Sequence, residues 1–153
     1  MEQSKGELFM HIRPISKEDK NEVFELMRVF YSTDAVSTDG SPEIFESDID
    51  ACLNNSPYLE GYVFCEENRI CGYGMLAKSF STEFGKPCIW IEDIYIKEEH
   101  RGKGMGSEFL NFVSDKYRDC VIRLEVEDYN KGAIRAYSKA GFCTLPYMEM
   151  IKN

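Results

Sequence analysis

The chain has 153 residues and a formal net charge of −9, and 43% of its residues are hydrophobic and 13% aromatic. This composition is that of one folded domain and excludes a disordered chain, while the acidic balance argues against binding to nucleic acid or to an anionic membrane. No apolar run approaches the ~20 residues that span a bilayer. The first residues of the chain lack the basic segment and following apolar segment of a signal peptide. We therefore expect no secretory signal and a cytoplasmic location.

The first half of the chain predicts a strand, two helices and a hairpin. Ser16 and Asp19 have the spacing of a capping box, and Ser41-Pro42 reads as the first two positions of a helix. Glu66-Glu67-Asn68-Arg69 separates two strand-like runs. The expected elements are a strand at 9–14, a helix at 17–30, a helix from 41 onward, and strands at 61–65 and 70–77.

The second half predicts alternating strands and helices. Apolar residues stand at both parities of the strand 88–96, which indicates that it is central and covered on both faces. Gly141 ends the last helix. The expected elements are strands at 88–96, 121–126 and 147–151 and helices at 104–117 and 130–140. With no linker or repeat, the order β-α-α-β-β-β-α-β-α-β indicates a single α/β domain with a mixed sheet.

The acidic charge is concentrated in the first part of the chain. Residues 1–60 hold 13 acidic and 5 basic residues, whereas residues 61–153 hold 14 and 13. A nearly neutral second part suits an anionic ligand, and an acidic first part would attract a cationic one.

The six cysteines form no C-x-x-C pair, and the two histidines, His11 and His100, lack metal-ligand spacing to them or to each other. We therefore expect no metal, and cysteines that are small buried hydrophobic residues in a reducing compartment. We expect each histidine to lie at the surface or at a strand end.

A glycine-rich turn between the central strand and the next helix carries the most chemical information. Gly102, Gly104 and Gly106 let the backbone turn tightly and point several N–H groups into one concavity, where Arg101 and Lys103 add positive charge. The positive end of the following helix dipole completes a pyrophosphate site. The glycine spacing matches neither the dinucleotide nor the Walker pattern. A flexible loop at a helix start is the alternative.

This turn resembles the coenzyme A signature of the GNAT superfamily of acyl-CoA-dependent N-acyltransferases, which reads here Arg101-x-x-Gly104-x-Gly106. A second segment resembles the late helix of the same family and carries Asn130, Ala133, Tyr137 and Gly141-Phe142. The resemblance covers residues 10–153 and leaves 1–9 as an N-terminal extension. It implies a GNAT-like fold, with a mixed central sheet of six to seven strands flanked by four helices, and it allows for a homodimer.

The resemblance also implies which residues bind the cofactor, acetyl-CoA. Main-chain groups of the central strand would bind the pantetheine arm, the turn would hold the pyrophosphate, and the late helix would bond the arm from the other side. The residues concerned are Ile94, Tyr95, Ile96, Arg101, Gly102, Lys103, Gly104, Met105, Gly106, Ser107, Asn130 and Ala133.

Catalytic and acceptor residues follow from the same resemblance. Tyr137 matches a tyrosine that acts as general acid toward the thiolate, and Glu92 matches a candidate base of the diamine and polyamine acetyltransferase branch. The alternatives are a tyrosine packed on the sheet and a glutamate that is solvated or salt-bridged near a strand end. Phe30, Tyr31 and Asp93 would border the acceptor amine, and Asp93 would support the structure rather than the chemistry.

The resemblance implies an acetyl-CoA-dependent N-acetyltransferase that acts on a primary amine by direct attack, and the acidic first part of the chain favours a small cationic amine. We expect no cysteine to have a paired histidine that would support an acyl-enzyme. The alternatives are acetylation of a protein N-terminus or lysine, and a non-catalytic acyl-CoA sensor, for which neither Tyr137 nor Glu92 would be needed.

Overall fold

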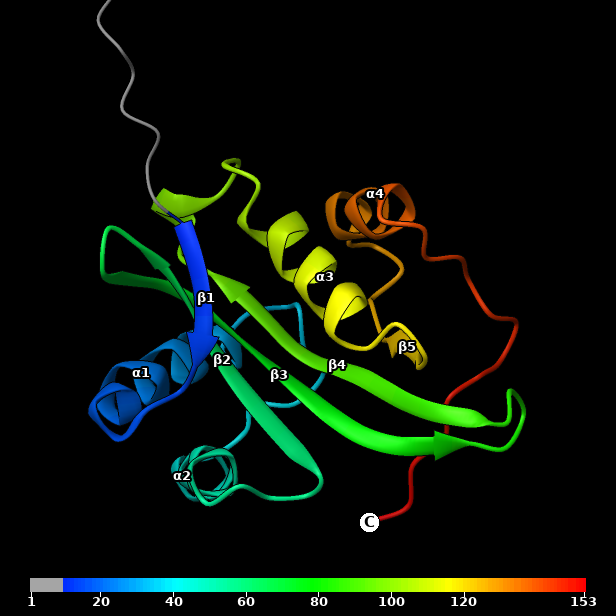
Figure 1. The fold of residues 1–153 in the computed structure, drawn as a ribbon, viewed down its shortest axis with the longest axis horizontal. Coiled ribbons are helices and arrows are strands. Elements are labelled where there is room, and N and C mark those ends of the chain that lie inside the picture. The colour runs from blue at the N-terminus through cyan, green and yellow to red at the C-terminus, as the bar shows by residue number, and fades with distance from the viewer. Residues whose placement is uncertain (1–9) are drawn as a thin grey trace, which may run out of the picture.

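The computed structural model describes residues 10–153, so the proposed extension 1–9 lies outside the described residues. Figure 1 shows that the strands form one sheet and that the helices pack against it. In chain order these are β1 (Met10–Pro14), η1 (Lys17–Asp19), α1 (Lys20–Phe30), α2 (Pro42–Leu53), β2 (Leu59–Glu66), β3 (Arg69–Ser81), β4 (Lys86–Ile96), η2 (Glu98–His100), α3 (Met105–Lys116), β5 (Val121–Leu124) and α4 (Lys131–Lys139).

The sheet is mixed and has the strand order β1-β2-β3-β4-β5. The first three pairings are antiparallel, and β4 pairs with β5 in parallel. The prediction of a central, doubly covered strand is confirmed, since β4 lies between β3 and β5. In Figure 1, α1 and α2 lie on one face of the sheet and α3 and α4 on the other.

The sheet has five strands rather than the expected six to seven. The predicted strand 147–151 does not form, and within the described residues no strand follows Leu124. The tail after α4 runs past β5 toward the β3–β4 turn (Figure 1), and the Tyr147 hydroxyl donates to Glu83 Oε1 at 3.0 Å. Met148, Met150 and Ile151 are 86–89% exposed, so the alternation of apolar residues there has no sheet edge to pair with.

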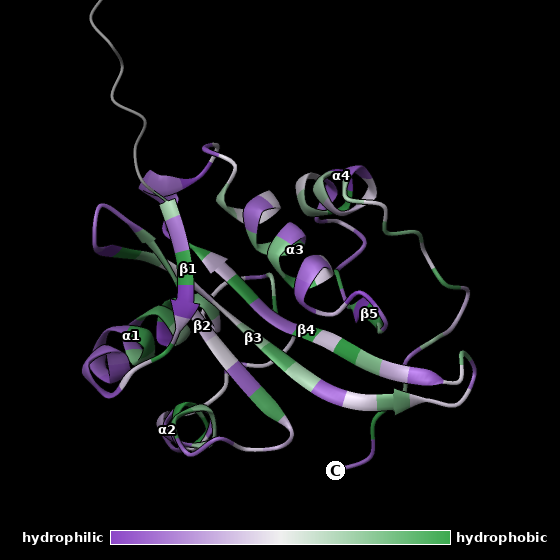
Figure 2. Ribbon diagram, in the orientation of Figure 1, coloured by the Kyte–Doolittle hydropathy of each residue, from purple (hydrophilic) through white to green (hydrophobic). Residues whose placement is uncertain are grey.

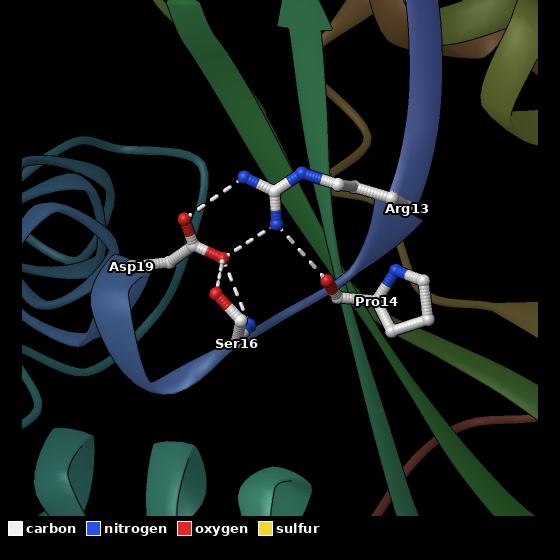
Figure 3. A network of polar contacts seen from close by, with 4 residues as sticks. All are labelled: Arg13, Pro14, Ser16 and Asp19. Carbon is white, nitrogen blue, oxygen red and sulfur yellow. Dashed lines mark hydrogen bonds and ion pairs between the residues drawn. The ribbon is translucent and has the colours of Figure 1, made fainter. Parts of the chain in front are cut away.

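The junction between β1 and α1 is fixed by the predicted Ser16–Asp19 pair and by an arginine (Figure 3). The carboxylate of Asp19 accepts from the Ser16 backbone N–H at 2.8 Å and from its hydroxyl at 3.0 Å. Arg13 donates to both carboxylate oxygens, at 2.7 and 3.0 Å. A bidentate ion pair of this kind orients both partners, so the start of α1 is held against the end of β1.

Two other local predictions are confirmed. Ser41 begins α2, since its hydroxyl accepts from the backbone N–H of Ile44 at 3.2 Å. Glu67 and Asn68 have left-handed backbone angles, with φ of +49° and +65°, and join β2 to β3. Two left-handed residues in succession match the right-handed twist of a two-residue hairpin.

Two apolar clusters cover the sheet, one on each face. The first joins α1 and α2 to β2 and β3 through residues such as Met27, Ile49 and Tyr73. The second joins α3 to β2, β3 and β4 through residues such as Phe109 and Phe64. Figure 2 shows apolar and polar residues alternating around α1 and α3, as expected for helices with one buried face.

The cysteines follow their prediction in part. Cys65, Cys71 and Cys88 are buried, Cys52 and Cys120 are half-buried, and Cys143 is exposed. No helix within residues 10–153 is both long enough and apolar enough to cross a membrane.

The half-buried carboxylate of Glu60 on β2 links the sheet to the end of α3 through hydrogen bonds. It accepts from Lys78 at 2.7 Å, Tyr117 at 2.6 Å and Tyr62 at 2.7 Å. Burial acts to raise the pKa of Glu60, but these donors outweigh it and lower the pKa to about 2. The ionised carboxylate therefore stabilises the fold above its unfolded-state pKa of 4.5, and that contribution is lost as the pH falls toward 2.

We expect Glu60→Gln to lower the free energy of unfolding at pH 7 by about 2–3 kcal/mol. Urea titrations at several pH values should show the gap between wild type and variant narrowing below pH 4.5, because the wild type then loses its charged acceptor. Glu25→Gln is the control, since Glu25 pairs with Arg28 one helical turn away, at the surface. A gap independent of pH would contradict the role of the ionised carboxylate.

Candidate active site

The central strand β4 continues beyond the end of its neighbour β5. Only Cys88–Ile91 of β4 pair with β5, at Val121–Leu124. On the other side, β3 pairs with β4 as far as Ile96. Along the β5 side, no strand among residues 10–153 pairs with the stretch from Glu92 to Ile96. Main-chain groups of Ile94 and Ile96 therefore lie along a free edge that an extended ligand can use.

The glycine turn follows β4 and leads into α3. Gly102 and Gly104 have φ of +77° and +86°, a region open to glycine, and a Cβ atom at either position would meet no atom within 4 Å. The first helical hydrogen bond of α3 runs from Glu108 N–H to Gly104 O at 2.9 Å. The N–H groups of Met105, Gly106 and Ser107 therefore precede the helical ladder, which is the arrangement that binds anions.

The cations near the turn are held by other groups. Arg101 Nε donates to the carbonyl of Ile96 at 2.9 Å, and its guanidinium lies 5.6 Å from the ring centre of Tyr95. Lys103 Nζ lies 3.2 Å from a carboxylate oxygen of Glu66. Lys103 is therefore partly neutralised, and backbone N–H groups are the main attraction for an anion at this turn.

Asn130 and Ala133 meet at the start of α4. The side-chain carbonyl of Asn130 accepts from the Ala133 N–H at 3.2 Å and so caps the helix. This commits the amide oxygen and leaves the NH2 group of Asn130 for a ligand.

Tyr137 lies on α4, half-buried, with its ring centre 6.0 Å from that of Phe142. Burial raises the pKa of its hydroxyl, so the group keeps its proton at neutral pH. The ring borders a cleft of about 680 Å³ between β5, α4 and the C-terminal tail, which also includes Trp90, Arg123 and Glu125. A protonated hydroxyl in a cleft can donate a proton to a leaving group.

A β-bulge in β4 places Glu92 and Asp93 in different surroundings. Met75 pairs with Asp93 and Leu76 with Ile91, so Glu92 is the extra residue of a β-bulge. The bulge reverses the side-chain alternation: Ile91 packs with the α3 cluster, while Asp93 faces α1. Glu92 is exposed, and Asp93 is 4% exposed.

Asp93 accepts hydrogen bonds from two tyrosines. The Tyr31 hydroxyl at the end of α1 donates to Oδ1 at 3.0 Å, and the buried Tyr73 hydroxyl donates to Oδ2 at 2.7 Å. Burial raises the pKa of Asp93, and the two tyrosines oppose this rise. Phe30, which we expect to border the acceptor, is 8% exposed and packs its ring among Tyr31, Tyr73 and Tyr95.

Further carboxylates that the sequence did not single out lie in the electrostatic surroundings of Glu92 and Asp93. Burial and the charge of Asp93 raise the pKa of Asp48 on α2 to about 6. Desolvation and the charges of Asp93, Glu149 and Asp48 raise the pKa of Glu92. Glu125, just after β5, has a pKa of about 7 because of desolvation and a hydrogen bond with Glu149. Asp48 follows the buried Phe45 by three residues, a spacing that places both on the same face of a helix. That spacing could have predicted from the sequence that Asp48 faces the sheet.

We expect Tyr73→Phe to lower the free energy of unfolding by about 1–3 kcal/mol, because Asp93 Oδ2 would lose its buried donor. Urea denaturation at pH 7 measures the loss. Tyr95→Phe is the matched control: it belongs to the same ring cluster, but its hydroxyl is not among the donors to Asp93. Equal losses in both variants would mean that ring packing, and not the bond to Asp93, carries the effect.

Comparison with known proteins agrees with this geometry. Residues 20–142 match the model of the Acetyltransferase (GNAT) family. Curated relatives named thialysine N-epsilon-acetyltransferase include one from Bos taurus, 40% identical over 75 residues, which are 47% of this chain and 44% of that protein. A Mus musculus relative of the same name is 33% identical over 75 residues. The aligned segments thus span about half the length of these relatives.

Solved structures share the fold at low sequence identity. One, described as a possible acetyltransferase from Clostridium difficile 630, has a TM-score of 0.79 at 20% identity and covers 96% of this chain and 98% of its own. An aminoglycoside N-acetyltransferase in complex with CoA has a TM-score of 0.78 at 12% identity and covers 99% of both chains. The match over residues 20–142 establishes that the chain belongs to the GNAT family of acetyltransferases.

Proposed function

We propose that the chain transfers the acetyl group of acetyl-CoA to a primary amine of a small cationic molecule by direct attack. The observation that carries the proposal is the free edge of β4, which ends at a turn of unpaired N–H groups and starts beside the carboxylates of Glu92 and Asp93. Family membership supports the acyl donor. The names of the thialysine acetyltransferase relatives support an amine acceptor.

The donor half of the site fits coenzyme A, which supplies the acetyl group as a thioester. Main-chain groups of Ile94 and Ile96 would bind the pantetheine arm along the free edge. Backbone N–H groups of Met105–Ser107 would bind the pyrophosphate, with Arg101 nearby. Tyr95 lies between these two residues, pairs with Tyr73 of β3 and packs its ring on Phe30, so it would act by holding the strand in place. The open space at Gly102 and Gly104 leaves the backbone accessible to a ligand.

The acceptor half favours positive charge. Desolvation raises the pKa values of Asp48, Glu92 and Asp93, and the charge of Asp93 raises those of Asp48 and Glu92 further. A bound cation would relieve this repulsion and favour the ionised carboxylates. A diamine suits the site, because one nitrogen can attack while the other keeps its charge beside Asp93 or Asp48.

Two side chains move the protons. Glu92 accepts one from the attacking ammonium, directly or through water, and its raised pKa makes it a stronger base than an ordinary glutamate. As the N–C bond forms and the C–S bond breaks, Tyr137 donates its hydroxyl proton to the sulfur. The nitrogen then loses its second proton, which returns to the Tyr137 oxygen directly or through water and leaves the neutral amide and the free thiol. Cys71 does lie near His100, contrary to the expectation that no cysteine has a histidine partner. Its thiol is fully buried and donates to Phe64 O, which disfavours an acyl-enzyme.

A thiol-release assay with acetyl-CoA and a panel of amines tests the proposal. We expect diamines and thialysine to stimulate release, more than an alkyl monoamine of equal length, a lysine peptide or an amino sugar. Glu92→Gln should lower kcat by about 100-fold or more, whereas Glu43→Gln, an exposed acid in the first turn of α2, should not. If no amine stimulates release while CoA still binds, the chain is an acyl-CoA sensor and the proposal fails.

The salt dependence of the same assay separates charge attraction from shape. At saturating acetyl-CoA, the KM for the diamine should rise several-fold between low salt and 0.5 M salt, because screening weakens attraction by Asp48 and Glu92. The monoamine should change less. Equal salt responses would mean that the acidic half of the chain is only a solvated surface.

A further inference from the structure

The fold brings together three side chains that could ligate a metal, in a place apart from the acceptor carboxylates. Ligand atoms of Glu66, Cys71 and His100 all lie within 4.8 Å of one another. They come from three segments: the end of β2, the adjoining part of β3, and η2 just before the glycine turn. The spacing of these residues in the sequence matches no metal motif, so only the hairpin and the return of β4 make them neighbours.

The cluster is mostly buried, and its carboxylate already pairs with the ammonium group of Lys103. Glu66 is 6% exposed and Cys71 fully buried, while the His100 side chain is 23% exposed. His100 Nδ1 lies 2.7 Å from Glu66 Oε2, and the Lys103 ammonium lies 3.2 Å from Oε1. A buried carboxylate needs a cation or donors, and here the histidine and lysine supply them. A metal ion on Glu66 would take the place of Lys103.

The donor set selects the kind of ion. One thiolate sulfur, one imidazole nitrogen and one carboxylate oxygen suit zinc and similar borderline-soft ions, whereas magnesium and calcium require oxygen ligands. Tetrahedral zinc places its ligand atoms roughly 3.5 Å apart. Side-chain movements of about 1 Å would bring atoms that lie within 4.8 Å to that separation.

We propose that Glu66, Cys71 and His100 bind one divalent ion of the zinc class, with water as the fourth ligand. On binding, the Cys71 thiol gives up its hydrogen bond to Phe64 O and releases its proton to solvent. The His100 ring coordinates through Nδ1 while its remaining proton is on Nε2. Lys103 leaves Glu66 and becomes available to the turn. The ion would fix η2, and with it the start of the pyrophosphate turn, to the β2–β3 hairpin. This inference does not depend on the proposed acetyl transfer.

Metal titration of the purified, reduced, metal-free chain tests the site without an activity assay. We expect one Zn²⁺ per chain by calorimetry, and with Co²⁺ a sulfur-to-metal charge-transfer band and the visible bands of a tetrahedral ion. Cys71→Ser should remove the charge-transfer band, and His100→Gln and Glu66→Gln should weaken Zn²⁺ binding at least about tenfold. Cys88→Ser is the matched control, since Cys88 is also buried, on β4, and belongs to no such group among residues 10–153.

Lys103→Ala should change the Zn²⁺ affinity in the opposite direction to the ligand variants. Removing the competing ammonium should tighten Zn²⁺ binding several-fold, an effect that ions held at unrelated surface groups would not show. The proposal is overturned if no Zn²⁺ binds at submillimolar concentrations, or if binding is unchanged in His100→Gln. His100 is partly exposed on a short turn, so this variant serves even if Cys71→Ser does not fold.

Discussion

Replacing Gly104 by valine should abolish binding of coenzyme A. A Cβ at this position would meet no protein atom within 4 Å, so the valine side chain would project into the space that is open to the ligand. The backbone adds a second effect. Gly104 has φ of +86°, which costs an L-residue roughly 1–2 kcal/mol and a β-branched one more. Relaxing that angle would break the bond from Glu108 N–H to Gly104 O and turn the N–H groups of Met105–Ser107 away from the anion.

Calorimetric titration with coenzyme A measures this loss, and Gly85→Val is its matched control. Gly85 lies in the β3–β4 turn, has φ of +62° and also has no neighbour within 4 Å of a Cβ. Both variants should therefore lose similar stability, whereas only Gly104→Val should lose coenzyme A. Unchanged affinity in Gly104→Val would exclude this turn as the pyrophosphate site.

Predictions that rest on local chemistry are confirmed by the fold. The Ser16–Asp19 pair, the Ser41-Pro42 helix start and the hairpin at Glu67-Asn68 each need only a few consecutive residues. The strand expected at 147–151 fails because alternation of apolar residues supplies only a propensity. A strand also needs a partner edge, and the tail runs past β5 without pairing to it.

The arrangement around Asp93 could not be predicted from spacing. Strict alternation places Glu92 and Asp93 on opposite faces but does not say which face each takes, and the bulge at Glu92 changes that assignment part-way along β4. The donors to Asp93 lie 62 and 20 residues away, at Tyr31 and Tyr73. Such contacts depend on which strands become neighbours, information that a single sequence does not carry locally.

Phe30 and His100 show what the spacing of residues can and cannot predict. The helical spacing of Val23, Leu26, Met27 and Phe30 predicts the core face of α1, and Phe30 is indeed 8% exposed. His100 has no partner at ligand spacing in the sequence, yet the hairpin places Glu66 beside it at 2.7 Å. Periodicity therefore identifies buried faces better than it identifies polar partners.

Tyr137→Phe should lower kcat for the favoured amine by about 10²- to 10⁴-fold and leave the KM for acetyl-CoA nearly unchanged. Burial raises the pKa of the hydroxyl, so it is fully protonated at neutral pH and can protonate the departing sulfur. Phenylalanine keeps the ring contact with Phe142 but has no proton to give. The melting temperature should therefore change little while turnover collapses.

Steady-state thiol release and thermal unfolding of the same preparations separate chemistry from packing. Tyr147→Phe is the control, because Tyr147 borders the same cleft but its hydroxyl donates to Glu83. We expect Tyr147→Phe to retain the wild-type kcat, and the solvent deuterium isotope effect on kcat to change only in Tyr137→Phe. If Tyr137→Phe keeps its full turnover, the tyrosine is a packing residue, and the sulfur must be protonated by water or by another donor of the cleft.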